Sequence, residues 1–173
     1  ISPTNWSGQS GGADAGGAIT YGDRFIAIET NTGKSITSTN GTSFPAAGTT
    51  ATYYLGGDGG ITYNGSLYVV SGASLGAGTT NIVSTSTDGT TWTNRVLPKV
   101  GIWSKSAYGN GRFVTVDSNS ASNEIATSSD GITWVSTTLP VTGVFYGVTY
   151  GNGKFAIPVY NTNKILVSVD GLT

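Results

Sequence analysis

The sequence predicts an all-β protein, a β-propeller of four blades with four antiparallel strands in each blade. Two lines of sequence recur four times, and the tyrosines that open one of them are 42, 45 and 42 residues apart. Glycine contributes 27 of the 173 residues, and Ser, Thr and Asn supply most of the polarity. Such residues suit strand surfaces and tight turns and suit helices poorly. Repeats of about 40 to 45 residues are typical of propeller blades.

Each repeat contains a hairpin motif and a turn motif. The hairpin motif reads Y-G-N-G-R-F from Tyr108 and Y-G-N-G-K-F from Tyr150, with weaker copies from Tyr21 and Tyr63. The turn motif reads S-T-D-G-T-T-W at 86–92 and S-S-D-G-I-T-W at 128–134, with related text at 38–44 and 168–173. We therefore expect one domain, with blades at about 7–44, 45–92, 93–134 and 135–173, the last completed by 1–6.

The third repeat shows how four strands arise in one unit. We expect strands at 104–108, 112–117 and 124–127, and a fourth that carries Trp134 and ends at Pro140. Asn110-Gly111 predicts a tight hairpin between the first two, because both central residues of a type I′ turn need positive φ. Proline has no N–H to donate, which places Pro140 at the end or edge of a sheet.

The two ends of the sequence predict how the last blade is completed. Trp6 lies 15 residues before Tyr21, and Trp92 and Trp134 each lie 16 residues before the next tyrosine. We expect the N-terminal segment to be the outer strand of the fourth blade, which would remove two exposed sheet edges. Two alternatives stay open: the chain is a fragment of a longer parent, or two chains close one larger circle of blades.

The composition excludes several classes of function. Eight Lys and Arg in the whole chain and a net charge of -1 predict no nucleic-acid partner, because binding to phosphates needs a basic face. No apolar run is long enough for a membrane-spanning helix, so we expect no membrane insertion. Cys and His are absent, which excludes thiol chemistry and the usual zinc, copper or haem ligands. We predict no cofactor and no metal site.

The S-x-D-G-x-T-W motifs at 86–92 and 128–134 resemble the Asp-box repeats of bacterial-neuraminidase-type proteins, although the family motif has one more residue between Asp and Gly. Together with the hairpin motif they resemble repeats of bacteriophage tail and virion proteins and of secreted bacterial proteins. The resemblance implies an extracellular or virion location and a structural role for the boxes. We expect Asp88 and Asp130 to accept bonds from the turn, and Trp92 and Trp134 to pack between blades.

The resemblance to sialidases does not extend to their catalytic residues. Those enzymes bind the substrate carboxylate with three arginines, but Arg24 and Arg112 occupy the same position of two different repeats. Glu29 and Glu124 lie in different parts of their own units, and no pair of carboxylates is marked by its spacing. We predict that the protein is not an enzyme.

The loops that join one blade to the next carry aromatic residues that the repeat does not require. Sugar rings bind to such aromatic platforms when polar groups lie beside them. The predicted ligand-binding residues are Tyr54, Asp58, Trp103, Lys105 and Tyr146. Alternatively, aromatics such as Trp103 and Phe145 fill the centre of the propeller.

The sequence predicts three candidate functions. The first is a non-catalytic recognition module that binds a cell-surface glycan or receptor, on a phage tail, a virion or a secreted bacterial protein. The second is a purely structural virion or surface domain that contacts other virion or surface proteins. The third is a degenerate glycosidase.

Overall fold

The computed structural model describes residues 17–29, 32–49, 53–54, 60–74, 78–119 and 122–173. Within these ranges the structure contains β-strands and no helix. All of the pairings between them are antiparallel. The all-β class and the four-unit organisation predicted from the repeats are therefore confirmed.

The strands form four larger sheets and one small ladder. The first sheet contains β1 (Ile19–Tyr21), β2 (Phe25–Ile28), β3 (Lys34–Ser38) and β4 (Ala46–Thr49). The second contains β6 (Gly60–Tyr63), β7 (Tyr68–Ser71), β9 (Thr80–Ser86) and β10 (Thr93–Gly101). The third contains β11 (Trp103–Gly109), β12 (Arg112–Asp117), β13 (Ser122–Ser128) and β14 (Val135–Gly143). The fourth contains β15 (Thr149–Gly151), β16 (Lys154–Pro158) and β17 (Ile165–Ser168), and β5 (Tyr53–Tyr54) pairs with β8 (Ala73–Ser74).

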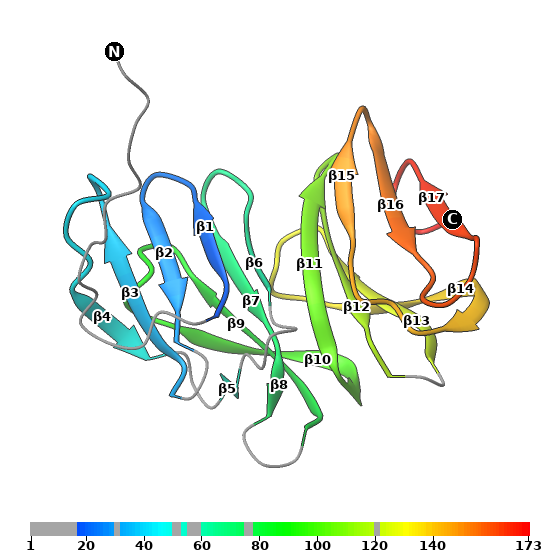
Figure 1. The fold of residues 1–173 in the computed structure, drawn as a ribbon, viewed down its shortest axis with the longest axis horizontal. Helices are drawn as coiled ribbons and strands as arrows, with labels where there is room; N and C mark the ends of the chain where they lie inside the picture. Colours follow the sequence, from blue (N-terminus) through cyan, green and yellow to red (C-terminus); the bar gives the residue numbers. More distant parts are fainter. Residues whose placement is uncertain (1–16, 30–31, 50–52, 55–59, 75–77, 120–121) are drawn as a thin grey trace.

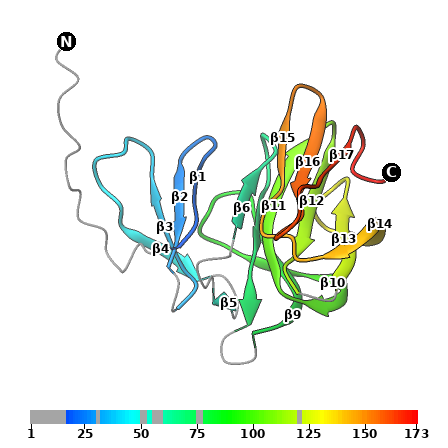
Figure 2. The ribbon, with the colours of Figure 1, turned by 45° about the vertical axis from the view of Figure 1, so that its right-hand side comes forward.

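The four sheets follow one another along an open arc (Figure 1). The first strands of successive sheets, β1, β6, β11 and β15, contact one another in that order. The first and fourth sheets lie at opposite ends of the arc, and turning the molecule shows the same succession (Figure 2). Each sheet thus meets its neighbour face to face, as propeller blades do.

Apolar residues fill each contact between neighbouring sheets. One cluster, which includes Ile26, Ile28 and Val70, joins the first sheet to the second. A second cluster joins the second sheet to the third through Val69 and Phe113. The third cluster joins the last two sheets. The core is therefore a series of small clusters between sheets, which follows from alternating side chains along each strand.

The predicted hairpins have the backbone conformation that their sequence requires. Asn110 and Gly111 have φ of 47° and 74°, and Asn152 and Gly153 have φ of 48° and 75°. Two successive residues with positive φ suit the right-handed twist of the flanking strands. Asn tolerates this region better than other side chains and Gly adopts it freely, which explains why these two residues stand here.

The outer strand of the third sheet differs from the prediction in its bounds. Trp134 precedes β14, and Pro140 lies inside the strand, which continues to Gly143. The expectation that Pro140 ends the strand was therefore wrong. The reason is that Pro140 lies in an irregular stretch of this edge strand, between Thr138 and Gly143, where no residue of β13 pairs with it and a missing N–H costs no sheet hydrogen bond.

The fourth sheet has three strands in the described part of the chain, not the four expected. No hydrogen-bonded pairing between described residues joins this sheet to the first one, so the arc does not close there. The segment 1–6, predicted to be the closing strand, lies outside the described residues.

Candidate functional site

Three turns between the last two strands of a repeat are built by the same serine and aspartate. In the third repeat the Asp130 carboxylate accepts the N–H groups of Ile132 and Thr133, both at 2.8 Å. The Ser128 hydroxyl accepts the Gly131 N–H at 2.8 Å and donates to Asp130 at 2.9 Å. Asp88 and Asp170 make the equivalent bonds in the second and fourth repeats.

These hydrogen bonds change the acidity of the turn aspartates. Bonds from the Thr91 and Thr90 N–H groups hold the pKa of Asp88 well below its usual value. Bonds from the Thr133 and Ile132 N–H groups lower the pKa of Asp130 in the same way. Each carboxylate is therefore committed as an anion to its own turn, as the sequence predicted.

Two tryptophans that follow these turns join neighbouring sheets. Trp134 is buried, its Nε1 donates to the Gly131 carbonyl at 3.1 Å, and its ring lies 6.3 Å from that of Phe113. The Nε1 of Trp92 contacts the Gly89 carbonyl and the Ser35 hydroxyl of the first sheet, both at 3.2 Å. The prediction that these aromatics pack between blades is confirmed.

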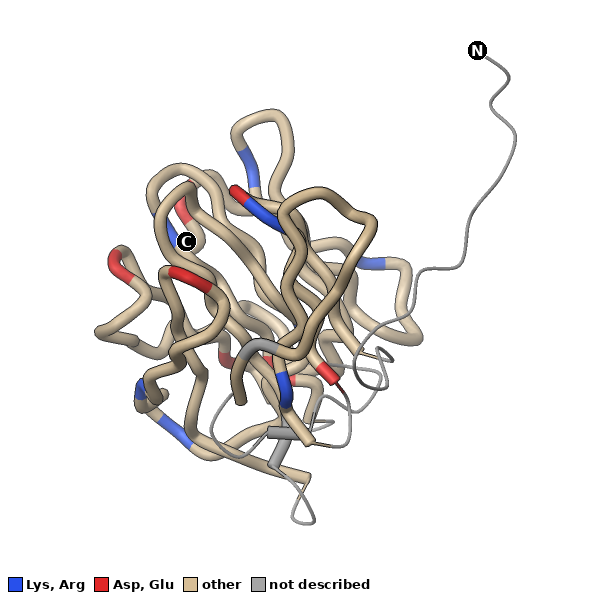
Figure 3. The backbone as a smooth tube through the Cα atoms, turned by 90° about the vertical axis from the view of Figure 1, so that its left-hand side faces the viewer, with Lys and Arg blue, Asp and Glu red and all other residues tan. Residues whose placement is uncertain are grey.

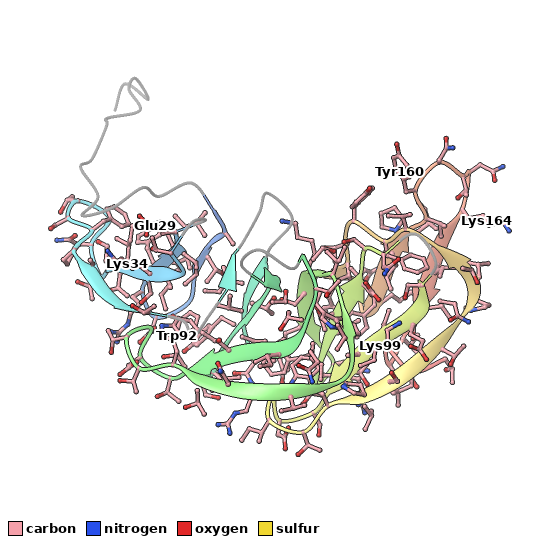
Figure 4. All side chains as sticks on the ribbon, turned by 90° about the horizontal axis from the view of Figure 1, so that it is seen from below. Glu29, Lys34, Trp92, Lys99, Tyr160 and Lys164 are labelled. Carbon is pink, nitrogen blue, oxygen red and sulfur yellow. The ribbon has the colours of Figure 1, made fainter. Side chains whose placement is uncertain are left out.

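A cluster of charged side chains, which the sequence did not mark, crosses from the second sheet to the third. The Lys99 ammonium lies 2.9 Å from Glu124 and 3.3 Å from Asp117. Burial lowers the pKa of Lys99, but the bonds to Glu124 and Asp117 outweigh that effect and raise it overall. Asp117 also accepts the Ile102 N–H at 3.0 Å. The Lys99 ammonium thus joins the second sheet to two carboxylates of the third. Lys99 lies over the middle of the arc (Figure 4).

Of the five residues predicted to bind a ligand, the structure describes the side chains of three, and these differ in burial. Asp58 lies outside the described residues, and so does the side chain of Tyr54. Trp103 on β11 is completely buried within the cluster between the second and third sheets, so the expectation of an exposed aromatic ring was wrong there. Phe145 is also fully buried, as the alternative of interior packing predicted. Lys105 is half-buried on β11, and Tyr146 is exposed.

Tyr146 forms an exposed pair with Tyr160, a residue that the repeat pattern did not single out. Their side chains are 48% and 60% exposed, and the two rings meet edge to face with centroids 5.1 Å apart. The Tyr160 N–H donates to the Val144 carbonyl at 3.0 Å, which fixes the loop after β16 beside the segment before β15. Tyr160 points away from the sheets at the end of the arc (Figure 4).

Polar residues follow Tyr160 along the same loop. Asn161, Asn163 and Lys164 follow Tyr160 on the same loop and are exposed. The Thr162 hydroxyl donates to the Val159 carbonyl at 2.8 Å and so stabilises the loop from within. An exposed edge-to-face tyrosine pair, followed on the same loop by amide and ammonium side chains, is a small surface of the kind to which sugars bind.

Charged groups and metal ligands are sparse in the described ranges. Lys and Arg are scattered over several sheets and loops and do not form one basic face (Figure 3). No group of three or more His, Cys, Asp or Glu residues lies close enough to hold a metal ion, as far as the described residues show. The same residues include no helix of the length and apolarity needed to cross a membrane.

No protein-family model matches the chain, and no curated protein sequence matches it significantly. Several solved structures do resemble it. A chain of the nidogen–laminin complex superposes with a TM-score of 0.63 at 12% identity, over 83% of this chain and 54% of the other. YCF48 from Cyanidioschyzon merolae superposes with a TM-score of 0.61 at 18% identity, over 90% and 53%. Both are β-propeller proteins.

A third similar structure is virginiamycin B lyase from Staphylococcus aureus, solved with quinupristin. Its TM-score is 0.59 at 16% identity, over 87% of this chain and 54% of the other. This lyase is also a β-propeller protein. The chain spans about half the length of each of these three relatives. At such low identities the likeness concerns the fold alone.

Proposed function

We propose that this protein is a non-catalytic recognition module that binds a carbohydrate of the kind displayed on cell surfaces. The exposed pair Tyr146–Tyr160 is the observation that carries the proposal. When an exposed aromatic ring stacks on the C–H face of a sugar, apolar area of both partners is removed from water, and this burial is favourable. The neighbouring Asn161, Asn163 and Lys164 offer donors and acceptors for hydroxyl groups.

The same proposal places the protein outside the cell or on a virion. It rests on the resemblance of the turn motifs to Asp-box repeats of phage tail, virion and secreted proteins. The hydrogen bonds of Ser128 and Asp130 give these motifs a structural role that needs no ligand. We therefore assign recognition to the loops at the other end of these strands, such as the loop between β16 and β17 that carries Tyr160.

A glycan array tests the proposal with four proteins. We expect the wild type to bind a subset of glycans, and Tyr146→Ala and Tyr160→Ala to weaken that binding by about tenfold, since each removes about 1 kcal/mol or more of stacking. Tyr21→Ala is the matched control, because Tyr21 is 62% exposed but lies on the first sheet. Binding that survives both substitutions, or that Tyr21→Ala weakens equally, would remove the proposed site.

A purely structural role on a virion or surface is the second candidate. The open arc and the exposed edge strand β17 favour it, because such an edge is a ready contact for another protein. A wild-type protein that binds no glycan on the array would favour this role over recognition. Hydrolysis of a fluorogenic sialoside would instead support the remote third candidate, a degenerate glycosidase, and we expect none.

A further inference from the structure

An apolar cavity of about 530 Å³ lies between the third and fourth sheets. Strands β12–β14 form one wall, and β16, β17 and the turn that follows β17 form the other. We call it the β17 cavity. The equivalent position one repeat earlier indicates which kind of side chain would fit this cavity.

The β17 cavity occupies the position that a tryptophan fills between the preceding two sheets. Trp134 lies in one apolar cluster with residues of the second and third sheets, namely Val69, Val83, Leu97, Phe113 and Ala126. One repeat later, the same positions of the third and fourth sheets are Val114, Ile125, Leu139, Phe155 and Leu166. All five of these residues line the cavity.

The turn that directs the indole into place is also formed beside the cavity. The Gly171 N–H donates to Ser168 at 2.8 Å, as the Gly131 N–H does to Ser128. Gly171 and Gly131 have φ of 73° and face equivalent neighbours, since a Cβ on Gly171 would lie 2.7 Å from Val114 and 3.4 Å from Phe155. Gly171 therefore presents the equivalent of the carbonyl that accepts the indole N–H of Trp134.

Beside the cavity, the outer edge of β17 pairs with no strand among the described residues. Its apolar side chains are exposed: Ile165 by 67% and Val167 by 57%. In the other two complete repeats, the strand after the tryptophan covers this edge, as β10 covers β9 and β14 covers β13. A strand edge without a described partner, next to an apolar cavity, suits a strand that is anchored by an aromatic residue.

We propose that a second copy of this chain fills the β17 cavity with Trp6 and adds its N-terminal segment to β17 as a fourth strand. Trp6 is preceded by Thr4-Asn5, as Trp92 is by Thr90-Thr91, and its distance to the next hairpin tyrosine is one residue shorter than in the repeats. The segment thus resembles the part of a repeat that follows the serine–aspartate turn. In the proposed dimer, residues 168–173 of the other copy supply that turn.

The shape of the molecule favours a second copy over the same chain as the source of this segment. Strand β1, which follows the segment, lies at the far end of the arc from β17 (Figure 1). The chain also spans only 53–54% of two propellers that it resembles. Two copies related by a two-fold axis would supply the other half and place each Trp6 in the partner's cavity. Such an isologous arrangement covers both open edges at once.

The repeat register specifies which residues become neighbours. Val135 pairs with Thr127 in the third sheet, and Thr93 pairs with Thr85 in the second. By the same register Ser7 faces Val167 of the other copy. Directly opposed residues of antiparallel strands lie close enough for a disulfide, and the chain has no cysteine of its own.

Cysteine cross-linking tests this register. Equal amounts of Ser7→Cys and Val167→Cys proteins are mixed, oxidised gently and analysed by mass spectrometry for a peptide pair that joins 7 to 167. We expect this link to exceed by about tenfold or more the link from Ser7→Cys to Val96→Cys, because strand pairing raises the local thiol concentration. Val96 is the matched control, since it is 65% exposed on the outer strand β10.

The outcomes separate the possible partners. A 7–167 link no stronger than the control overturns the proposal. A double Ser7→Cys/Val167→Cys protein that forms its disulfide as a monomer also overturns it, and favours closure within one chain. Sedimentation gives a second measurement: we expect a wild-type dimer, and a rise of about 100-fold in its dissociation constant for Trp6→Ala. A monomeric wild type would contradict us.

This inference is independent of carbohydrate binding. The β17 cavity lies against the turn after β17, whereas Tyr160 lies on the loop before that strand. A wild type that dimerises but binds no glycan would contradict the proposed function alone, whereas a monomeric wild type that binds glycans would contradict this inference alone.

Discussion

At the residue scale, one serine and one aspartate organise the turn after the third strand in three of the four repeats. The Ser128 hydroxyl and the Asp130 carboxylate together accept four backbone N–H groups of residues 130–133. In the first repeat Asn40 replaces the aspartate and still accepts the Thr42 N–H at 3.0 Å. The turn therefore needs an acceptor oxygen at this position, and the charge adds strength to the bonds.

This charge makes the turns sensitive to acid. The folded-state pKa values of Asp88 and Asp130 lie below the usual value, so the unfolded chain binds protons more readily. Their contribution to stability is thus fully present above about pH 4 to 5 and is lost as the pH falls through the folded pKa values. We expect the free energy of unfolding to decrease between about pH 5 and pH 2.

Urea titration at several pH values measures this decrease. The variant Asp88→Asn/Asp130→Asn keeps an acceptor oxygen in both turns, as Asn40 does, and we expect a clearly shallower decrease below about pH 4. An equally steep decrease in wild type and variant would mean that other carboxylates cause the acid sensitivity. Ser136→Ala serves as a neutral control, since Ser136 is exposed on β14.

At the element scale, neighbouring sheets are joined by the tryptophans that follow two of the turns and by a few long-range polar bonds. Trp134 and Phe113 form the apolar contact between the second and third sheets, and Lys99 bridges the same two sheets through Asp117. Between the first and second sheets the Tyr68 hydroxyl donates to Asp23 at 2.5 Å. Burial and this bond raise the pKa of Tyr68 to about 12, so the phenol stays neutral and keeps donating.

Trp134→Ala tests the contact between sheets. Trp134 is only 6% exposed, so its removal leaves a cavity between two sheets that the backbone cannot close. We expect a loss of about 3–5 kcal/mol in the free energy of unfolding, measured by denaturant titration. Val135→Ala is the matched control, because Val135 is the next residue and is 50% exposed. A loss below about 1 kcal/mol for Trp134→Ala would contradict its packed role.

At the scale of the whole molecule, the described sheets form an arc with an apolar cavity at one end, beside a strand edge that no described strand covers. Stability of an open arc then depends on what covers that end, because exposed apolar area is costly in water. If a second copy covers it, unfolding is coupled to dissociation, and the apparent stability depends on protein concentration.

Thermal melting at several concentrations checks this dependence. We expect the midpoint of the wild-type chain to rise by several degrees over a hundredfold increase in concentration. The Trp6→Ala midpoint should stay nearly constant over the same range. A constant wild-type midpoint would show that the folded chain unfolds as a monomer.

The repeated text of the sequence was sufficient for the all-β class, the four units, the Asn-Gly hairpins and the structural role of Asp88 and Asp130. These features depend on residues that are near one another in the chain, so short motifs encode them. The sequence also predicted that Trp134 lies between sheets, because a large aromatic residue recurs at the end of the turn motif.

Only the tertiary structure showed that Trp103 is buried, that Tyr160 lies beside Tyr146 and that Lys99 bridges two sheets. It also decided that the sheets form an open arc in the described part of the chain. The physical reason is common to all four: each depends on the angle and distance between neighbouring sheets. Many weak apolar contacts between residues far apart in sequence set that geometry, and no local pattern records it.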